Sequence, residues 1–508
     1  MKSRILSYVT ATTLLAALAI PVRPVAQEIK PEKPNHHRYK LVNLGTFAGP
    51  VGYLNWPGAQ VLTNRRTVVG AADTSTPNRN YPNSCLVCPP DPFVFHAFRW
   101  QKSVLTDLGA LPGVNNSFAN WISANGLIAG FSQNGVIDPL LGIPEVDAVL
   151  WKDGEIINLG TLEGGYESAA FAVNNRGQVV GAVLNRIPDP FGLGTQARAF
   201  LWQNGTMRDL GTLGGNDANA LFVNERGQIA GWALTNSTPN PVTNFPTQDP
   251  FLWENGKMRD LGTLGGTLGF PTAFNNRGQV VGQSNLTGDL TFHPFLWERE
   301  VLTDLGTFGG ETGTSNAIND AGEVVGKADL PGPLPQTHDA FLWRQAVMTD
   351  LGRLYSDQCS NAVSINSKSQ VVGCSSDCTN CLHPFLWEDG APMIDLNTFV
   401  PPDLDVQLTF AVSINDRGEI ACFGKPPGAP PRDGDSQAPV FLLIPCEGEH
   451  SDDEGCADGA ESTTTARSAP YVQTSTTARR RSVPASELPD RIHSRFGRNR
   501  GFTPWLPK

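Results

Sequence analysis

Residues 270–306 read FPTAFNNRGQVVGQSNLTGDLTFHPFLWEREVLTDLG and contain one complete copy of a repeat that fills most of this 508-residue chain. The copy has four short apolar segments, namely one that ends at Asn275 and then 280–282 (VVG), 295–297 (FLW) and 304–306 (DLG). Short apolar segments bounded by turn residues are typical of β-strands. The repeat therefore predicts a four-stranded antiparallel meander.

The turn between the first two segments has the same chemistry in several copies. Asn stands first and Gly stands fourth at residues 174–177, 224–227, 275–278 and 319–322. An Asn side chain accepts a hydrogen bond from the backbone two residues on, and Gly tolerates a positive φ. This pattern predicts a tight hairpin turn in each copy.

A Trp closes the third segment in seven copies, spaced 44 to 51 residues apart. These residues are Trp100, Trp151, Trp202, Trp253, Trp297, Trp343 and Trp387. The predicted cores of the repeats are 52–109, 117–160, 167–211, 217–262, 270–306, 313–352, 359–397 and 408–445. The last core lacks a fourth strand, and residues 41–45 at the start of the repeat region supply a spare one.

Such a sheet cannot bury its two faces alone. Stacking the copies face to face around an axis buries them and leaves only short edges. The sequence therefore predicts an all-β, eight-bladed β-propeller of four-stranded antiparallel blades over residues 41–445. We expect the N-terminal strand at 41–45 to lie beside residues 440–444 and to close the last blade.

The two ends of the chain differ from the repeat region. An apolar stretch at residues 14–20, preceded by basic residues and followed by prolines, predicts a signal peptide over residues 1–26. The stretch is shorter than a membrane-spanning helix requires, so we expect no transmembrane segment. Residues 447–508 are acidic, then rich in Ser and Thr, then rich in Arg, which predicts a disordered low-complexity tail. We expect a secreted or extracytoplasmic protein of the cell envelope.

Residues 96–98 read His-Ala-Phe, and related segments stand at 293–295, 338–341 and 383–385. With these segments, the chain resembles the extracellular HAF-repeat family over about residues 41–445. The resemblance implies an exported propeller and carries no known activity. The strand order within a blade is also similar to the kelch type, although the paired glycines here follow Asp-Leu-Gly.

Three kinds of repeated side chain could suggest chemistry. The Trp residues recur in strands that we expect to pack between blades, which favours a structural role over sugar stacking. The Asp residues of Asp-Leu-Gly are nearly equivalent in every copy, which favours turn capping. The histidines before Phe have no second ligand at metal-binding spacing, so a hydrogen-bonded structural role is expected. We therefore predict no catalytic residue, no cofactor and no metal.

Nine cysteines break the repeat, six of them in two of its copies: Cys85, Cys88, Cys359, Cys374, Cys378 and Cys381. Two C-x-x-C pairs could suggest a zinc site. The pairs lie almost a whole ring apart, however, and export favours disulfide bonds. We predict that the four cysteines of the seventh copy pair among themselves, with Cys359 joined to Cys374 or Cys378. Nine is odd, so one thiol is left over or pairs with another chain.

The loops between the second and third strands vary in length and fall on one rim, which is where binding sites usually lie. A net charge of −11 argues against nucleic-acid binding. We expect a monomeric, non-catalytic extracellular binding or structural scaffold whose variable rim takes a protein or a polysaccharide. The alternative is a secreted glycan-acting enzyme, a hydrolase or lyase, that uses loop acids such as Asp138, Asp147, Asp189 or Asp249.

Overall fold

The computed structural model describes residues 38–446 and Cys456, apart from 56–57, 83, 140–141, 190, 192–193, 333–336 and 428–437. The predicted signal peptide at 1–26 and the predicted tail at 447–508, Cys456 excepted, lie outside the described residues. The described chain runs from strand β1 (Tyr39–Asn43) to strand β32 (Val440–Pro445) and has one 3₁₀ helix, η1 (Leu396–Phe399). The prediction of an all-β fold is confirmed.

The strands form six four-stranded sheets and one eight-stranded sheet. The first three sheets comprise β2 (Ala48–Tyr53), β3 (Thr67–Pro77), β4 (Phe93–Gln101) and β5 (Val104–Gly109); β6 (Ser117–Ile122), β7 (Ile128–Ile137), β8 (Pro144–Lys152) and β9 (Glu155–Asn158); and β10 (Gly165–Val173), β11 (Val179–Asp189), β12 (Gly194–Gln203) and β13 (Thr206–Asp209). The eight-stranded sheet comprises β14 (Ala218–Val223), β15 (Ile229–Pro239), β16 (Pro246–Glu254), β17 (Lys257–Asp260), β18 (Gly265–Phe274), β19 (Val280–Leu286), β20 (Phe292–Glu298) and β21 (Val301–Asp304).

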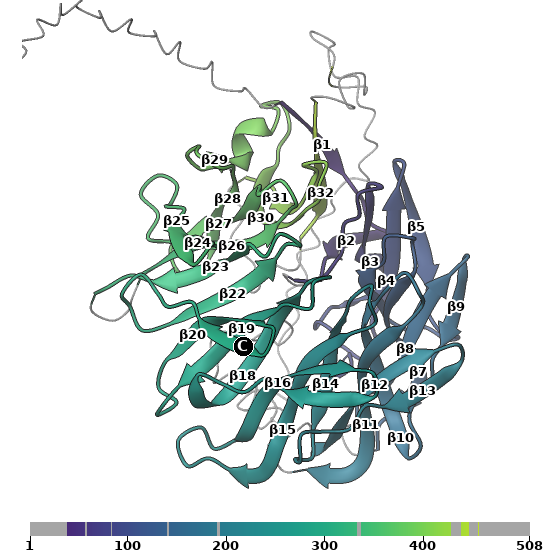
Figure 1. The fold of residues 1–508 in the computed structure, drawn as a ribbon. Coiled ribbons are helices and arrows are strands. Elements are labelled where there is room, and N and C mark those ends of the chain that lie inside the picture. The colour runs from purple at the N-terminus through teal and green to yellow at the C-terminus, as the bar shows by residue number, and fades with distance from the viewer. Residues whose placement is uncertain are drawn as a thin grey trace, which may run out of the picture. The chain divides into compact units, whose positions relative to one another are not determined.

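The last three sheets comprise β22 (Gly313–Ile318), β23 (Val324–Asp329), β24 (His338–Arg344) and β25 (Val347–Asp350); β26 (Cys359–Ile365), β27 (Val371–Ser376), β28 (Cys381–Trp387) and β29 (Ile394–Asp395); and β30 (Gln407–Ile414) and β31 (Ile420–Lys425) with β32 and β1. Figure 1 shows the successive meanders side by side. No helix in the described part of the chain is long and apolar enough to cross a membrane.

The hairpin turns have the chemistry that the sequence predicts. In the turn between β10 and β11, Gly177 has a φ of 73°, and its N–H donates to the carbonyl oxygen of Asn174 at 3.1 Å. The Oδ1 atom of Asn174 accepts from the backbone of Arg176 at 3.0 Å and of Gln178 at 3.1 Å. Only Gly adopts this φ at no steric cost, so the turn fixes the register of the two strands.

Two sheets differ from a plain four-stranded meander. In the eight-stranded sheet, two meanders are joined by one parallel pair between Gln248 of β16 and Leu268 of β18. In the sheet of β30–β32, the fourth strand comes from the start of the chain, because β1 pairs antiparallel with β32 through Leu41 opposite Leu443 and Val42 opposite Leu442. The prediction that residues 41–45 lie beside 440–444 is confirmed.

The first and last sheets contact each other directly. The N–H of Gly52 in β2 donates to the carbonyl oxygen of Ala438, just before β32, at 3.2 Å, and the Asn415 amide donates to the carbonyl oxygen of Thr63 at 2.9 Å. Arg66 forms an ion pair with Glu419, whose side chain is fully buried, at 2.7 Å. Segments that are distant in sequence therefore hold the two ends of the repeat region together.

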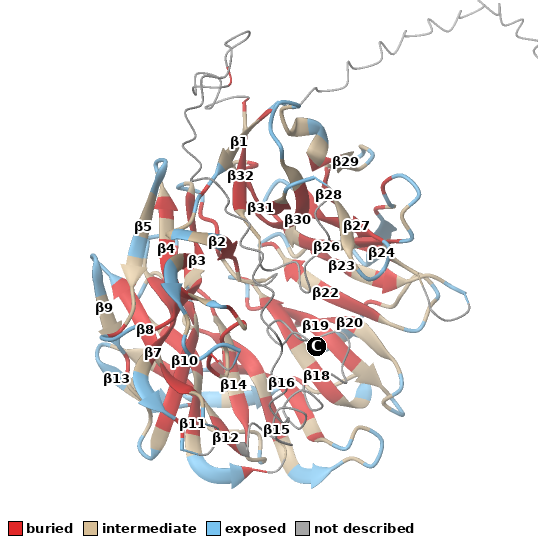
Figure 2. Cartoon of the chain, turned by 180° about the vertical axis from the view of Figure 1, so that it is seen from behind, coloured by how far each residue is buried: buried red, intermediate tan, exposed pale blue. Residues whose placement is uncertain are grey.

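The core lies on the middle strands of each sheet. The Phe of the Phe-Leu-Trp segment is fully buried in most copies, as Phe200, Phe251 and Phe295 show. Opposite this Phe, Gly181 faces a bulge in β10, and a Cβ there would lie 2.0 Å from the carbonyl oxygen of Ala169. Figure 2 shows the buried residues along the inner strands and exposed residues on outer strands such as β9 and β13.

The structure contains four disulfides: Cys85–Cys88, Cys359–Cys378, Cys374–Cys381 and Cys446–Cys456. The prediction of disulfide bonds is confirmed. The hairpin turn places Ile365 opposite Val371, and a bulge between Ala362 and Ser364 then brings Asn361 opposite Cys374, with Cys359 opposite Ser376. The left-over thiol is Cys422, which is buried, so burial raises its pKa.

Candidate active site

A polar pair recurs beside the Asp-Leu-Gly turn. The residue just before the third-strand core faces the Asp eleven positions later, as with His96 and Asp107 at 2.9 Å and His293 and Asp304 at 2.9 Å. The other oxygen of Asp107 accepts from the N–H of Gly109 at 2.7 Å. The repeated Asp therefore caps a turn and orients a neighbour on the same hairpin, which is a structural role.

The sheet of β26–β29 departs from this repeat. His383 occupies the same position as His293, but its Nδ1 atom lies 2.8 Å from Oδ2 of Asp357, a residue of the connection that precedes β26. The Asp357 side chain is only 6% exposed, whereas that of Asp304 is 42% exposed. A buried carboxylate from a different segment has replaced the strand-four partner of this histidine.

The strand-four Asp of this sheet has other partners. Asp395 caps η1 by accepting from the N–H of Asn397 at 2.9 Å, and its second oxygen accepts from the hydroxyl of Tyr355 at 3.0 Å. The Tyr355 ring stands edge-on to His383 with the ring centroids 4.8 Å apart, and 70% of the residue is exposed. The hydrogen bond to Asp395 and its charge raise the pKa of Tyr355.

His383 and Asp395 line a groove of about 390 Å³. Its polar side chains are His383, Asp395, Asn397 and Gln407, and its apolar ones are Val400, Pro401, Pro402, Leu404, Val406 and Pro427. The apolar wall comes mostly from the connection between η1 and β30. A concave surface with an apolar wall and a few convergent polar groups is the usual form of a small-molecule or substrate site.

The arrangement can transfer protons. A carboxylate that accepts the Nδ1 proton of a histidine fixes the tautomer in which Nε2 is the proton acceptor. Asp357 can do this for His383, so His383 is suited to act as a general base. Tyr355 keeps its proton at neutral pH and can donate it, although the raised pKa makes it a weaker acid than an unperturbed tyrosine.

A second group of titratable side chains lies between β8 and β10, where the structure brings together two of the predicted loop acids, Asp138 and Asp147, with Glu145 and Glu167. Burial and the charges of Asp138, Glu145 and Asp147 raise the pKa of Glu167 to about 8, although the N–H of Val146 donates to it at 3.2 Å. Burial is also the main cause that raises the pKa of Glu145.

Three of the four carboxylates in this cluster are buried, and Asp147 is partly exposed. Asp138 is 0% exposed, Glu167 2% and Glu145 4%. The guanidinium of Arg186 lies over the Tyr166 ring at 4.8 Å from its centroid. The buried Glu167 and Glu145 therefore make stability depend on pH, because their charged forms are disfavoured in the folded protein.

The other two predicted loop acids lie apart from both groups. Asp189 accepts from the N–H of Phe191 at 2.7 Å and from the Asn216 amide at 2.8 Å. Asp249 faces Asp260, and burial together with that neighbouring charge raises its pKa to about 7. Within the described residues, no group of three or more His, Cys, Asp or Glu is placed to hold a metal ion.

Most of the residues that the sequence analysis singled out have structural positions in the fold. Trp100, Trp151, Trp253, Trp297 and Trp387 are buried, and Trp202 and Trp343 are partly buried against neighbouring cores. Sequence reasoning missed Tyr355 and Asp357, and it gave His383 a structural role. One signal was present: this copy has Asp-Leu-Asn in place of Asp-Leu-Gly at 395–397, followed by a longer connection.

Comparisons with known proteins bear on the fold. No family model and no curated protein matches the chain, so membership of the HAF-repeat family stays a prediction. The β-propeller domain of the Trilobed protease from Pyrococcus furiosus is similar at 10% identity and a TM-score of 0.40, over 69% of this chain and 100% of that one. The acylaminoacyl peptidase of Pyrococcus horikoshii is similar at 10% identity and a TM-score of 0.39, over 74% and 58%.

A sialidase from Trypanosoma rangeli is also similar, at 10% identity and a TM-score of 0.29, over 80% of this chain and 59% of that one. The similar solved structures are thus enzymes or domains of enzymes, and the prediction of a non-catalytic scaffold is corrected accordingly. Their substrates do not transfer to this chain at such low identity. The chain is an all-β protein with propeller-like sheets, and its chemistry must be argued from its own groove.

Proposed function

We propose that this protein is an exported enzyme that cleaves a uronic-acid-containing glycan by β-elimination in the groove beside His383. One observation carries the proposal: the Nδ1 atom of His383, which lines the groove, is held by the buried carboxylate of Asp357, and the Tyr355 ring contacts His383 while its hydroxyl donates to Asp395 in the groove. A positioned base and a positioned acid are the two groups that this reaction requires.

The proposed step needs no water and no metal. Nε2 of His383 removes the proton on the carbon next to the uronate carboxyl group. The electron pair left on that carbon forms a C=C bond, and the glycosidic C–O bond breaks. The leaving oxygen takes the proton of Tyr355, so that His383 ends with an additional proton and Tyr355 without one. Transfer of these protons through solvent restores the starting state.

The groove suggests which form of the substrate is preferred. Its described lining has the acidic Asp395 and no Lys or Arg, while Val400, Pro401 and Leu404 give it an apolar wall. An ionised uronate would meet like charge there without a cation to compensate. We therefore expect a neutral uronic ester, whose methyl group packs on the apolar wall and whose α-proton is more acidic than that of a free carboxylate.

Several further features belong to this proposal. We treat the eight-stranded sheet as two blades, which gives an eight-bladed propeller closed by β1, and the contact between the first and last sheets supports this count. Disulfides are typical of exported proteins and support a secreted or cell-envelope location. The glycan takes the place of the unknown partner at the variable rim, and the protein acts as a monomer.

The test uses the full-length secreted chain and two forms of one polymer, methyl-esterified and de-esterified polygalacturonate. We expect the ultraviolet absorbance of an unsaturated product with the esterified polymer, and much less with the de-esterified one. His383→Ala and Tyr355→Phe should abolish this absorbance. The matched control is His293→Ala, which removes the equivalent histidine of another sheet and should keep full activity.

Two results would count against the proposal. New reducing ends without an unsaturated product would indicate hydrolysis and overturn the β-elimination step. Equal loss of activity in His293→Ala and His383→Ala, with equal loss of thermal stability, would show that the histidines matter only for folding.

A further inference from the structure

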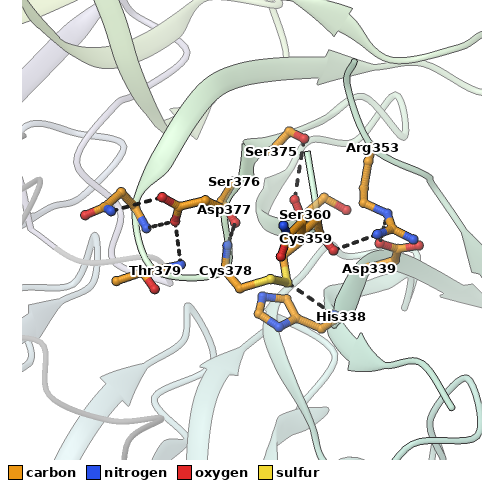
Figure 3. Close-up of a disulfide and its surroundings, with 12 residues drawn as sticks. His338, Asp339, Arg353, Cys359, Ser360, Ser375, Ser376, Asp377, Cys378 and Thr379 are labelled. Atoms are coloured by element: carbon orange, nitrogen blue, oxygen red, sulfur yellow. Dashed lines mark hydrogen bonds and ion pairs between the residues drawn. A yellow bond between two sulfur atoms is a disulfide. The ribbon is translucent and has the colours of Figure 1, made fainter. Parts of the chain in front are cut away.

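Two disulfides flank the His383–Asp357 pair. Cys359 follows Asp357 by two residues and is bonded to Cys378, and Cys381 precedes His383 by two residues and is bonded to Cys374. Each segment that supplies one member of the pair is therefore cross-linked next to that member. Figure 3 shows the Cys359–Cys378 bond with the side chains around it.

The pair needs this support because of its topology. His293 and Asp304 are 11 residues apart on one hairpin, β20–β21, whose ladder holds them together. His383 and Asp357 are 26 residues apart: Asp357 lies in the connection before β26, and His383 lies on β28, two strands away in the same sheet. No single hairpin ladder contains both residues, so a shift of the connection before β26 relative to the start of β28 would part the two side chains.

Few backbone hydrogen bonds hold the connection between β27 and β28, which precedes His383. In the β27–β28 connection, the N–H of Asp377 donates to the carbonyl oxygen of Asn380 at 3.4 Å, a long hydrogen bond. The register between β27 and β28 also shifts between Ser375 and Ser376. On the other segment, Arg353 donates to the carbonyl oxygen of Gln358 at 2.6 Å and pairs with Asp339 at 2.8 Å. The segment of Asp357 thus has polar anchors next to Cys359–Cys378. His383 is held in the β27–β28 ladder opposite Ser375, and Cys374–Cys381 fixes the start of β28 beyond the register shift.

We propose that Cys374–Cys381 and Cys359–Cys378 are positioning residues for the His383–Asp357 pair, and that the site is assembled only when both bonds are oxidised. Each bond forms when two thiols lose two protons and two electrons to a disulfide-exchanging oxidant, which is reduced. Reduction by a dithiol reverses the step. The inference deepens the proposed function, because it makes activity depend on an oxidising compartment.

The experiment compares three variants of the full chain: Cys374→Ala/Cys381→Ala, Cys359→Ala/Cys378→Ala and, as a matched control, Cys85→Ala/Cys88→Ala in the first sheet. The first readout is the downfield proton resonance of the His383 Nδ1–H group, assigned by its loss in His383→Ala. We expect the two test variants to lose or broaden this resonance and the control to keep it. This readout does not depend on any substrate.

The second readout is lyase activity on methyl-esterified polygalacturonate. We expect roughly a 10- to 100-fold lower kcat in each test variant, because a displacement of about 1 Å of a catalytic group has that effect. The change should fall on kcat and leave KM nearly constant. Dithiothreitol should produce the same loss in the unsubstituted protein, and reoxidation should reverse it, which covers the case in which a variant does not fold.

The two readouts, the His383 resonance and the lyase activity, separate this inference from the proposed function. An unchanged resonance in both test variants and in the reduced protein overturns the positioning role, whatever the activity. A lost resonance in a protein that never cleaves the polymer keeps the positioning role and rejects the proposed reaction. Loss of the resonance in the Cys85→Ala/Cys88→Ala control as well would show a general effect on folding and would also overturn the inference.

Discussion

The Nδ1 atom of His383 lies 2.8 Å from Oδ2 of Asp357, whereas the equivalent His293 is paired with the strand-four Asp304 at 2.9 Å. The same repeat position thus holds two histidines with different partners. His293 is paired across an exposed hairpin edge, whereas His383, which lines the groove, is paired with a carboxylate that is 6% exposed. One copy of a structural repeat has been altered where a substrate could bind.

Replacing Asp357 by Asn should lower kcat about 100- to 10,000-fold on a polymer that the protein cleaves, which is the usual contribution of a general base. The Asn amide would donate to Nδ1 and favour the tautomer with the proton on Nε2, so that His383 could no longer accept a proton there. Steady-state kinetics with Asp304→Asn as the control would check this. Equal losses in both variants would contradict a special role for Asp357.

Stability should fall as the pH rises through the range set by Glu167. The pKa of Glu167 is about 8 in the folded protein and 4.5 for the free side chain, so the folded state binds more protons between these values. The stabilising contribution of protonated Glu167 is therefore fully present below about pH 4.5. It is lost as the pH rises toward 8, which lowers the free energy of unfolding by about 2–5 kcal/mol.

Denaturant unfolding of Glu167→Gln at pH 5 and pH 9 would measure this effect. Gln has no charge to lose, so its free energy of unfolding should change less with pH than that of the unsubstituted protein. Glu163→Gln is a suitable control, since Glu163 is an exposed residue of the turn that precedes β10. A pH dependence that Glu167→Gln leaves intact would place the responsible group elsewhere.

Asp260→Asn should stabilise the protein above pH 7 and change it little at pH 5. Burial and the charge of Asp260 raise the pKa of Asp249 to about 7, so at higher pH the two carboxylates repel each other. The protein already contains the compensated form of this pair, since the Asn158 amide donates to Asp147 at 2.6 Å. Melting temperatures at pH 5 and pH 8 test the expectation, and a lower melting temperature at both would refute it.

Trp253→Ala should lower the free energy of unfolding by about 3–5 kcal/mol, as the loss of a buried large aromatic side chain usually does. Trp253 is 7% exposed and packs in the core shared by the third sheet and the eight-stranded sheet. Trp202 is only partly buried, so Trp202→Ala should have a smaller effect. Equilibrium denaturation compares the two, and a loss below about 1 kcal/mol for Trp253 would mean that its ring is not part of the core.

The sequence by itself determined the repeated meander, the Asn-initiated turns and the pairing of residues 41–45 with 440–444. These features depend on local turn chemistry, on side-chain periodicity and on the count of strands, all of which can be read along the chain. The turn at Asn174 and Gly177 shows this, because the residues that make its hydrogen bonds are four neighbours in sequence.

Only the tertiary structure decided which polar residues meet. Asp357 and His383 are 26 residues apart, and nothing in the repeat pattern indicates that the connection before β26 reaches the start of β28. Glu167 lies on β10 and Asp138 follows β7 of another sheet, and the raised pKa of Glu167 arises from burial and from the charge of Asp138, which the folded chain brings close. Long-range contacts of this kind depend on how neighbouring sheets pack and on how irregular connections cross the rim. A periodic sequence pattern carries no information on either, and so the candidate site became visible only in the folded protein.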